Sequence, residues 1–326
     1  MNNRESLPDS HKKVLVGMSG GVDSSAAALI LKKQGCDVKN VILRMHDENM
    51  TPEDLSNGKL PLGIWYAREA ARRMRLDFTI LDVRGAFHQE IIDPFVKDCE
   101  ANQIPDPCVR CCAEFLLPKL FQVADRLECE FIATGHYAVT GYDEQRKRYV
   151  VRKSRDAQND ESHVLYRLSQ EQLARILTPL GQYEKSEVRS IARDARLKNA
   201  QTPDSPAICF IPDRHYREFL SDKAEGQVPE QIEDPFYTEG PCAKVIRASQ
   251  LYYSGIEEPL PQGMRLRARI RSSANESDVF ARINGDGLLE VEPDQPLRAA
   301  VPGHSIVLYD GDVVAMGGMI KEVLFE

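Results

Sequence analysis

Several features that would place this chain in a membrane or a repeat architecture are missing. Its 326 residues contain no apolar run of about 18 residues, the length that spans a bilayer, and the first residues form no apolar signal segment. No internal repeat and no low-complexity tract is present. We therefore expect a cytoplasmic protein that has no membrane partner.

Two common nucleotide-binding signatures are also absent from the glycine-rich segment near the N-terminus. The string Ser19-Gly20-Gly21-Val22-Asp23-Ser24-Ser25 has neither the Gly-Lys-Ser/Thr ending of a Walker loop nor the spacing Gly-x-Gly-x-x-Gly. It does join an apolar run at 14–16 to an amphipathic segment at 25–31. Adjacent glycines, hydroxyls and the amides of a first helical turn together form a phosphate cradle. The alternative is a purely structural strand-to-helix turn.

The composition is that of an ordinary soluble protein with two domains. Hydrophobic residues make up 42% and charged residues 28%, and the net charge of −8 argues against indiscriminate nucleic-acid binding without excluding a local basic surface. Eight cysteines without a secretory signal indicate reduced, metal-bound or catalytic thiols rather than a disulfide framework.

The first two thirds of the chain alternate short apolar runs with helical patterns. This alternation predicts an α/β fold with a doubly wound parallel sheet. The expected strands are 14–18, 38–45, 78–83 and 131–134, and the expected helices are 25–33, 64–74, 114–127, 170–177 and 187–197. We assign residues 1–220 to this domain.

The remainder of the chain has a different pattern. Prolines interrupt the segment from about Gly226 to Gly263, which indicates a connector with two short strands, and we assign it 221–262. Alternating apolar positions with Asn-Gly and Asp-Gly turns then predict hairpins, and residues 263–326 are expected to form a small antiparallel β-barrel.

Three cysteines stand in contexts that suggest chemistry. Cys108 and Cys111 precede a helix that begins near Ala113, and Cys209 lies in a proline-bounded loop about a hundred residues later. A helix N-terminus lowers the pKa of a thiol, so we expect the first two to be reactive. One Cys-x-x-Cys pair alone is weak evidence for structural zinc, which needs four ligands.

Several strings together resemble the tRNA-specific 2-thiouridylase family of ATP pyrophosphatases. They are residues 16–25, Pro107 with Cys111, Ala133-Thr134-Gly135-His136-Tyr137, residues 165–173, residues 203–210, Pro302-Gly303-His304-Ser305 and Tyr309-Asp310-Gly311-Asp312. The resemblance is dense from about residue 13 to 220 and returns in the barrel.

The resemblance implies an activity and a set of site residues. In the family, ATP with Mg²⁺ adenylates the 2-carbonyl oxygen of the tRNA wobble uridine, a sulfur atom replaces it, and AMP and pyrophosphate are released. Cys209 matches the persulfide-bearing cysteine and Cys111 the partner that attacks it. The ATP-binding positions are Gly17, Met18, Ser19, Gly20, Gly21, Val22, Asp23, Ser24, Ser25, Leu43 and Gly135, and the tRNA-contact positions are Asp160, Glu161, Ser162 and Arg271.

One departure from the family pattern concerns Cys108, where an aspartate is usual. Three cysteines, Cys108, Cys111 and Cys209, resemble the variant in which sulfurtransferases bind a four-iron, four-sulfur cluster and leave one iron open for sulfide. The competing interpretations are a persulfide route with Cys108 as a bystander, or adventitious zinc. The sulfur donor is either a cysteine desulfurase relay or free sulfide.

The second departure is the short connector, because the family's central domain there helps to bind tRNA. A feature that favours tRNA binding is the alternation of arginines with apolar residues over 265–271, which would place the arginines on one face of a strand. That face would either track a phosphate backbone or pair with acidic neighbours such as Glu290 and Glu292. We interpret the run Arg72-Arg73-Met74-Arg75 as a solvated helix face.

Two other functions remain open from the sequence alone. The same chemistry on another RNA or a small molecule fits the shortened connector. A non-catalytic iron–sulfur nucleotide-binding protein is the second alternative, and the intact phosphate loop argues against it.

Overall fold

A computed structural model describes most of the chain. The described residues are 11–47, 50, 54, 57–101, 103, 105–204, 208–211, 216–223, 242–257, 260, 262–270, 276–295, 297–298 and 300–325. No described helix has the length and apolar character that crossing a membrane requires.

The first domain is built on a parallel sheet, as the alternating pattern predicts. Its strand order is β3-β2-β1-β4-β7, and neighbouring strands in it pair in parallel. The strands are β1 (Lys13–Met18), β2 (Asp37–Arg44), β3 (Asp77–Asp82), β4 (Phe131–Ala133) and β7 (Ile176–Leu177). Val14 and Val16 enter one core cluster while Leu15 enters another, because alternate side chains of a strand point to opposite faces of the sheet.

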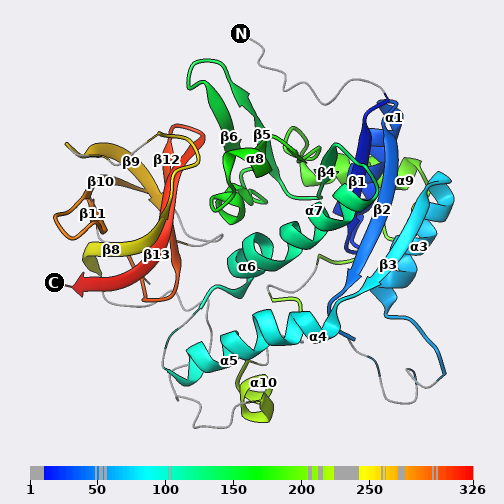
Figure 1. The fold of residues 1–326 in the computed structure, drawn as a ribbon, viewed down its shortest axis with the longest axis horizontal. Helices are drawn as coiled ribbons and strands as arrows, with labels where there is room; N and C mark the ends of the chain where they lie inside the picture. The colour runs from blue at the N-terminus through cyan, green and yellow to red at the C-terminus, as the bar shows by residue number, and fades with distance from the viewer. Residues whose placement is uncertain are drawn as a thin grey trace.

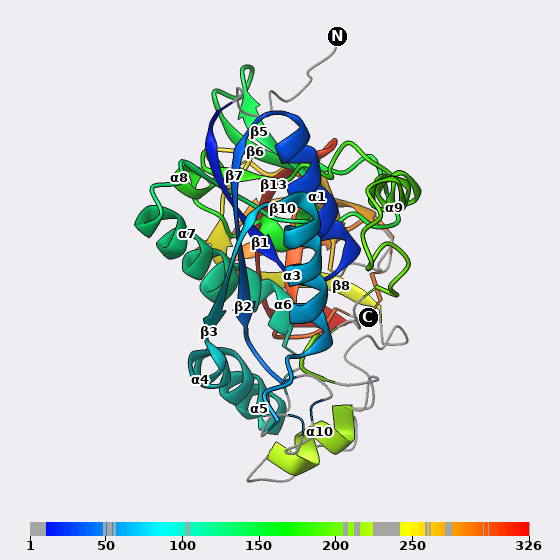
Figure 2. The ribbon, with the colours of Figure 1, turned by 90° about the vertical axis from the view of Figure 1, so that its right-hand side faces the viewer.

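Helices cover both faces of this sheet. Figure 2 shows α1 and α3 on one side of β1 to β3 and α7 on the other. The helices are α1 (Val22–Lys33), α3 (Leu62–Met74), α4 (Arg84–Phe87), α5 (Asp93–Glu100), α6 (Pro107–Arg110), α7 (Leu117–Arg126), α8 (Gln170–Leu173), α9 (Lys185–Asp194) and α10 (Tyr216–Lys223), with the 3-10 turn η3 (Ser162–Leu165). The π-helical segments η1 (His88–Ile92) and η2 (Cys111–Leu116) join α4 to α5 and α6 to α7.

The second domain is the predicted antiparallel barrel. Six described strands follow the order β12-β9-β10-β11-β8-β13, and β12 also pairs with β13, which closes the ring. They are β8 (Ala243–Tyr252), β9 (Met264–Arg269), β10 (Ser277–Ile283), β11 (Leu289–Pro293), β12 (Ser305–Asp310) and β13 (Val313–Phe325). The barrel stands beside the parallel-sheet domain in Figure 1.

Two local expectations from the sequence differ from the structure. The helix expected at 170–177 ends at Leu173, and Ile176 and Leu177 instead form β7, because they pair with Ile132 and Ala133 at the edge of the sheet. The ten-residue strand β8 lies where two short connector strands were expected. The barrel sheet therefore begins at Ala243, while residues 224–241 of the assigned connector lie outside the described part of the chain.

The two domains share one hydrophobic core and a buried polar contact. Leu15 and Leu120 of the first domain belong to the same cluster as Val307 and Tyr309 of the barrel. The hairpin of β5 (Ala138–Asp143) and β6 (Arg148–Lys153) joins the barrel sheet through β13. Beside it, Arg269 donates to Asp160 at 2.6 Å, and the two side chains are only 10% and 1% exposed.

We expect that removing Arg269 weakens this interface strongly. The Asp160 carboxylate also accepts from Ser154 N and Ser162 Oγ, but Arg269→Met would leave its charge buried without a counter-ion. Such a loss costs about 3 to 5 kcal/mol of unfolding free energy. Denaturant unfolding measures it, and the double variant Asp160→Asn with Arg269→Met should recover part of the loss because the unpaired charge of Asp160 is removed as well. Equal stability of the single variant and the wild type would contradict the role given to this pair.

Candidate functional site

The glycine-rich segment forms a tight loop between β1 and α1. Gly20 has a φ of +89°, and a Cβ there would lie 2.1 Å from the carbonyl oxygen of Gly63, so only glycine fits. Ser19 N donates to Ser24 Oγ at 3.0 Å, and Gly21 N lies 3.3 Å from Ser19 Oγ. The backbone is thus already folded around the N-terminus of α1, where anions bind.

A side chain from beyond α9 holds this loop from outside. The amide of Asn199 donates to the carbonyl oxygens of Gly20 and Gly21 and to Ser25 Oγ, at 2.8 to 3.0 Å. Asn199 is buried, so these hydrogen bonds are protected from water. They hold the carbonyl groups of Gly20 and Gly21 on the side of the loop that faces Asn199.

The acidic residue of the loop is held by a cation and a phenol. The carboxylate of Asp23 accepts from Lys185 Nζ at 2.7 Å and from Tyr137 Oη at 2.8 Å. Lys185 also lies 2.7 Å from Asp204, which belongs to the segment that leads toward Cys209. Burial and the Asp23 carboxylate raise the pKa of Tyr137, so its hydroxyl remains a donor.

The two residues expected to border adenosine lie at the ends of the strands that flank β1. Leu43 is buried near the end of β2, and Gly135 follows β4. A Cβ on Gly135 would lie 2.6 Å from Ser24 N, so this glycine permits close packing against the first turn of α1. Both therefore lie at the carboxyl edge of the sheet, where ligands bind in this class of fold.

The three candidate cysteines lie around one hydrophobic cluster in the structure. Cys108, Cys111 and Cys209 all pack against one cluster of aromatic and aliphatic residues that includes Phe87, Phe115 and Phe210. Met45, just after β2, and Val83, just after β3, join the same cluster, which places the cysteines beyond the carboxyl ends of those strands. The spacing in sequence did not show this convergence.

The expectation of lowered thiol pKa values is wrong. Burial raises the pKa of Cys108 well above its ordinary value and that of Cys111 to about 12, and the neighbouring Cys209 adds to both shifts. The N-terminus of α6 is already capped by Asp106, whose carboxylate accepts from Val109 N. Desolvation and negative neighbours therefore raise the pKa of these thiols by more than the helix dipole lowers it.

The cysteines are not arranged around a single metal ion. Among the residues described, no group of three or more His, Cys, Asp and Glu side chains is placed to hold one. A four-iron cluster differs from a single ion because each iron takes its own thiolate, which spreads the ligands around a larger body. Three neighbouring thiols fit such a cluster in kind and number, with one iron left for an external ligand.

The residues predicted to contact tRNA have other contacts in the structure. Asp160 and Ser162 are buried at the domain interface, where Ser162 Oγ lies 3.0 Å from Tyr309 Oη, and Glu161 accepts from Tyr137 N at 3.0 Å. Arg271 lies outside the described residues. The tRNA contacts of these four residues stay a prediction.

The row of arginines on β9 pairs with acidic residues, one of the two interpretations of the sequence. Arg265 pairs with Asp294, Arg267 lies 3.2 Å from Glu276, and Arg269 bridges Asp160 and Glu276. The acidic partners are not Glu290 and Glu292, which bind Arg282 across the β10–β11 hairpin instead.

Sequence reasoning missed four residues that shape the phosphate loop: Gly63, Tyr137, Lys185 and Asn199. Tyr137 stands in a string that the sequence did single out, so its position after a strand was a usable signal. Lys185 and Asn199 lie more than 150 residues from the loop in sequence; Lys185, for example, is 162 residues from Asp23. Only the packing of α9 on α1 brings them there.

The glycine-rich loop after β1 and the parallel strands beside it define the first domain as a nucleotide-binding α/β domain of the pyrophosphate-loop class. A β-barrel follows this domain. Residues 12–213 match the family described as "tRNA methyl transferase HUP domain", and residues 243–320 match the family described as "Aminomethyltransferase beta-barrel domain". The chain belongs to the tRNA-specific 2-thiouridylase family, as the motifs indicated.

Individual relatives match over nearly their whole length. The chain is 34% identical to tRNA-specific 2-thiouridylase MnmA 1 of Thermoanaerobacter sp. (strain X514) over 357 aligned positions, which cover 95% of this chain and 98% of the relative. It is 32% identical to tRNA-specific 2-thiouridylase MnmA of Acetivibrio thermocellus over 359 positions, covering 96% and 100%. Both alignments are longer than the 326 residues of this chain, so these relatives contain segments that it lacks.

Among solved structures, the U34-tRNA thiolase NcsA from Methanococcus maripaludis, with its four-iron, four-sulfur cluster, is similar at a TM-score of 0.40 and 18% identity. That likeness covers 66% of this chain and 64% of the thiolase. It is too distant to assign a cofactor to this chain.

Proposed function

We propose that this protein is an ATP-dependent sulfurtransferase that converts a wobble uridine of tRNA into 2-thiouridine. The observation that carries the proposal is the position of two sites at one edge of the parallel sheet: the phosphate loop follows β1, and the cysteine cluster lies beyond β2 and β3. The relatives' names, over nearly full length, support the substrate class.

The first half of the reaction belongs to the phosphate loop. ATP would bind as Mg²⁺-ATP, with its phosphates on residues 17–25 and its adenosine between Leu43 and Gly135. The 2-carbonyl oxygen of uridine attacks the α-phosphorus, and pyrophosphate leaves. The fixed amides at the N-terminus of α1 stabilise the negative charge that develops on the phosphates.

The second half belongs to the cysteines. A sulfur nucleophile attacks C2 of the adenylated uridine, and AMP leaves with the original oxygen. This substitution needs no oxidant. We propose that Cys108, Cys111 and Cys209 hold a four-iron, four-sulfur cluster, which when bound supplies an iron site for the sulfide to be transferred. Phe87, Phe115 and Phe210 belong to the cluster against which these thiols pack.

Protein purified without oxygen tests the cofactor, by its iron and acid-labile sulfide content and visible spectrum. We expect about four irons per chain, by the ligand count of such a cluster, and their loss in Cys108→Ala. The matched control is Cys242→Ala, which removes a cysteine outside the cluster. Iron-free wild-type protein would return Cys209 to the persulfide role, in which Cys111 attacks Cys209 Sγ, releases sulfide and leaves a disulfide for an external thiol to reduce.

The sulfur donor forms a separate part of the proposal. Free sulfide and a cysteine desulfurase relay are both compatible with a cysteine cluster at the edge of the domain. Thiolation with sulfide alone, at a rate equal to that with a desulfurase and cysteine, would identify sulfide as a sufficient donor.

A further inference from the structure

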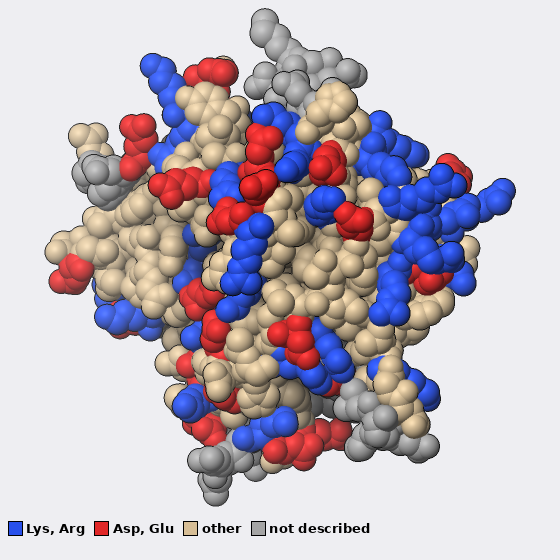
Figure 3. Space-filling view, turned by 45° about the vertical axis from the view of Figure 1, so that its right-hand side comes forward, with Lys and Arg blue, Asp and Glu red and all other residues tan. Residues whose placement is uncertain are grey.

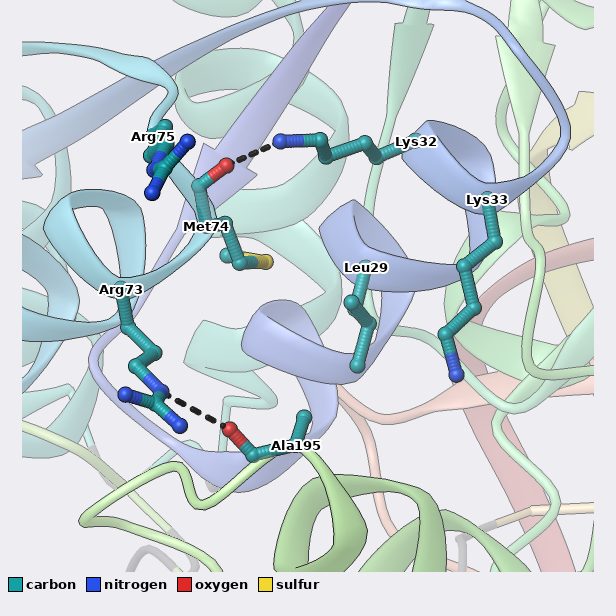
Figure 4. Close-up of a pocket in the computed structure, with 7 residues that line it drawn as sticks. All are labelled: Leu29, Lys32, Lys33, Arg73, Met74, Arg75 and Ala195. Carbon is teal, nitrogen blue, oxygen red and sulfur yellow. Dashed lines mark hydrogen bonds between the residues drawn. The ribbon is translucent and has the colours of Figure 1, made fainter.

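A surface cavity lies at the other end of α1 from the phosphate loop. It has a volume of about 360 Å³ and lies where α1, α3 and α9 end (Figure 4). Its lining residues are Leu29, Lys32, Lys33, Arg73, Met74, Arg75 and Ala195. Four of these seven are cations and none is acidic, so we call it the basic cavity.

Two of the four cations have structural partners. Lys32 donates to the carbonyl oxygen of Met74, and Arg73 Nε donates to that of Ala195 at 3.2 Å (Figure 4). These bonds satisfy carbonyl groups at the ends of α3 and α9, as cations at helix C-termini commonly do. The side chains of the other two cations, Lys33 and Arg75, also stand at helix C-termini but take no part in these bonds.

The side chains of Lys33 and Arg75 make no hydrogen bond or ion pair with any described residue. The neighbouring Arg72, in contrast, pairs with Glu69 at 2.9 Å, and Lys39 pairs with Asp77 at 2.6 Å. The chain has 50 acidic residues against 42 Lys and Arg, so acidic partners are abundant elsewhere. Four clustered like charges without a carboxylate repel one another, and an anion bound between them would offset that repulsion.

The chemistry of the lining points to phosphate groups rather than a nucleoside. No aromatic side chain among the lining residues is available to stack a base, and the apolar part consists of Leu29, Met74 and Ala195 only. The cavity is also separate from the ATP site. Because α1 has 12 residues, its two ends are about 18 Å apart, which is longer than a triphosphate.

We infer that the basic cavity binds backbone phosphates of the substrate tRNA, at a distance from the reacting uridine. This inference rests on the proposed function. Lys and Arg side chains also gather on the right-hand side of the surface in Figure 3, in a protein whose net charge is −8. Such a surface suits a long polyanion, which several cations contact at once.

The test is the salt dependence of binding to a tRNA transcript with uridine at the wobble position. The double variant Lys33→Gln with Arg75→Asn removes the two cations that hold no structural bond, and asparagine tolerates the φ of 52° at position 75. The matched control is Arg126→Gln with Lys147→Asn, which removes two exposed charges elsewhere, one of them also at a φ of 52°.

We expect the slope of log K against log salt to fall by about 1.5 in the cavity variant, at roughly 0.7 to 0.9 for each phosphate that is no longer neutralised, and to stay unchanged in the control. Pyrophosphate release at a saturating tRNA concentration should equal that of the wild type, because the basic cavity is separate from the ATP site. Equal slopes for the cavity variant and the control would overturn the inference. If the cavity variant loses binding of tripolyphosphate but keeps the wild-type slope for tRNA, the inference is also overturned, because the cavity then binds a small anion. If wild-type protein binds no tRNA, the proposed function fails instead.

Discussion

Gly135→Ala should reduce the affinity for ATP by about 10- to 100-fold, which corresponds to the cost of about 1 to 3 kcal/mol for adding a methyl group to a closely packed position. The new Cβ would lie 2.6 Å from Ser24 N and 2.9 Å from the carbonyl carbon of Asp23. Both are backbone atoms of the first turn of α1, so they cannot rotate away as a side chain does. The loop after β4 or the N-terminus of α1 must shift, and the phosphate cradle shifts with it.

Gly285→Ala is the matched control for this change. Gly285 lies in the turn between β10 and β11, and a Cβ there would have no heavy atom within 4 Å. Calorimetric titration with ATP and Mg²⁺ measures both variants, and thermal unfolding confirms that each is folded. Wild-type affinity in Gly135→Ala would show that the nucleotide does not occupy this edge of the sheet.

Cys209→Ala should lower tRNA thiolation to below about 1% of the wild-type rate while ATP binding is retained. Cys209 contributes a sulfur in either route, as a cluster ligand or as the persulfide carrier. It packs in the aromatic cluster with Cys108 and Cys111 and is not part of the phosphate loop. The loss is therefore confined to the sulfur half of the reaction.

Cys242→Ala serves as the control here as well, because Cys242 stands just before β8, outside the cluster. Thiolation is measured by nucleoside mass spectrometry, and ATP affinity by titration. Normal thiolation in Cys209→Ala would exclude both sulfur routes, whereas loss of ATP affinity in the same variant would indicate general unfolding rather than a chemical role.

Much of the fold could be predicted from local patterns. The apolar runs at β1, β2, β3 and β4 and the periodicity of α1 and α3 each depend on neighbouring residues, and the structure confirms them. The alternating positions of β9 to β12 predicted the barrel for the same reason. The two-residue strand β7 could not be predicted, since its conformation is determined by pairing with β4 and its own sequence continues a helical pattern.

The site was predictable only where its residues are consecutive. The glycine-rich string indicated a phosphate loop, but nothing near it indicated Asn199 or Lys185, which tertiary packing brings to the loop from far along the chain. The prediction for the cysteine pKa values was wrong for a related reason. The helix N-terminus was visible in the sequence, whereas the burial of Cys108 and Cys111 and the cap by Asp106 were not.

The most direct test of the central claim is a reaction of the purified, anaerobic protein with ATP, Mg²⁺, sulfide and a tRNA transcript that carries uridine at the wobble position. AMP, pyrophosphate and thiolated nucleoside are quantified together. We predict one AMP and one pyrophosphate for each 2-thiouridine formed, with none of the three when tRNA is omitted. Release of AMP with tRNA present but no 2-thiouridine, or ADP as the nucleotide product, would contradict this claim.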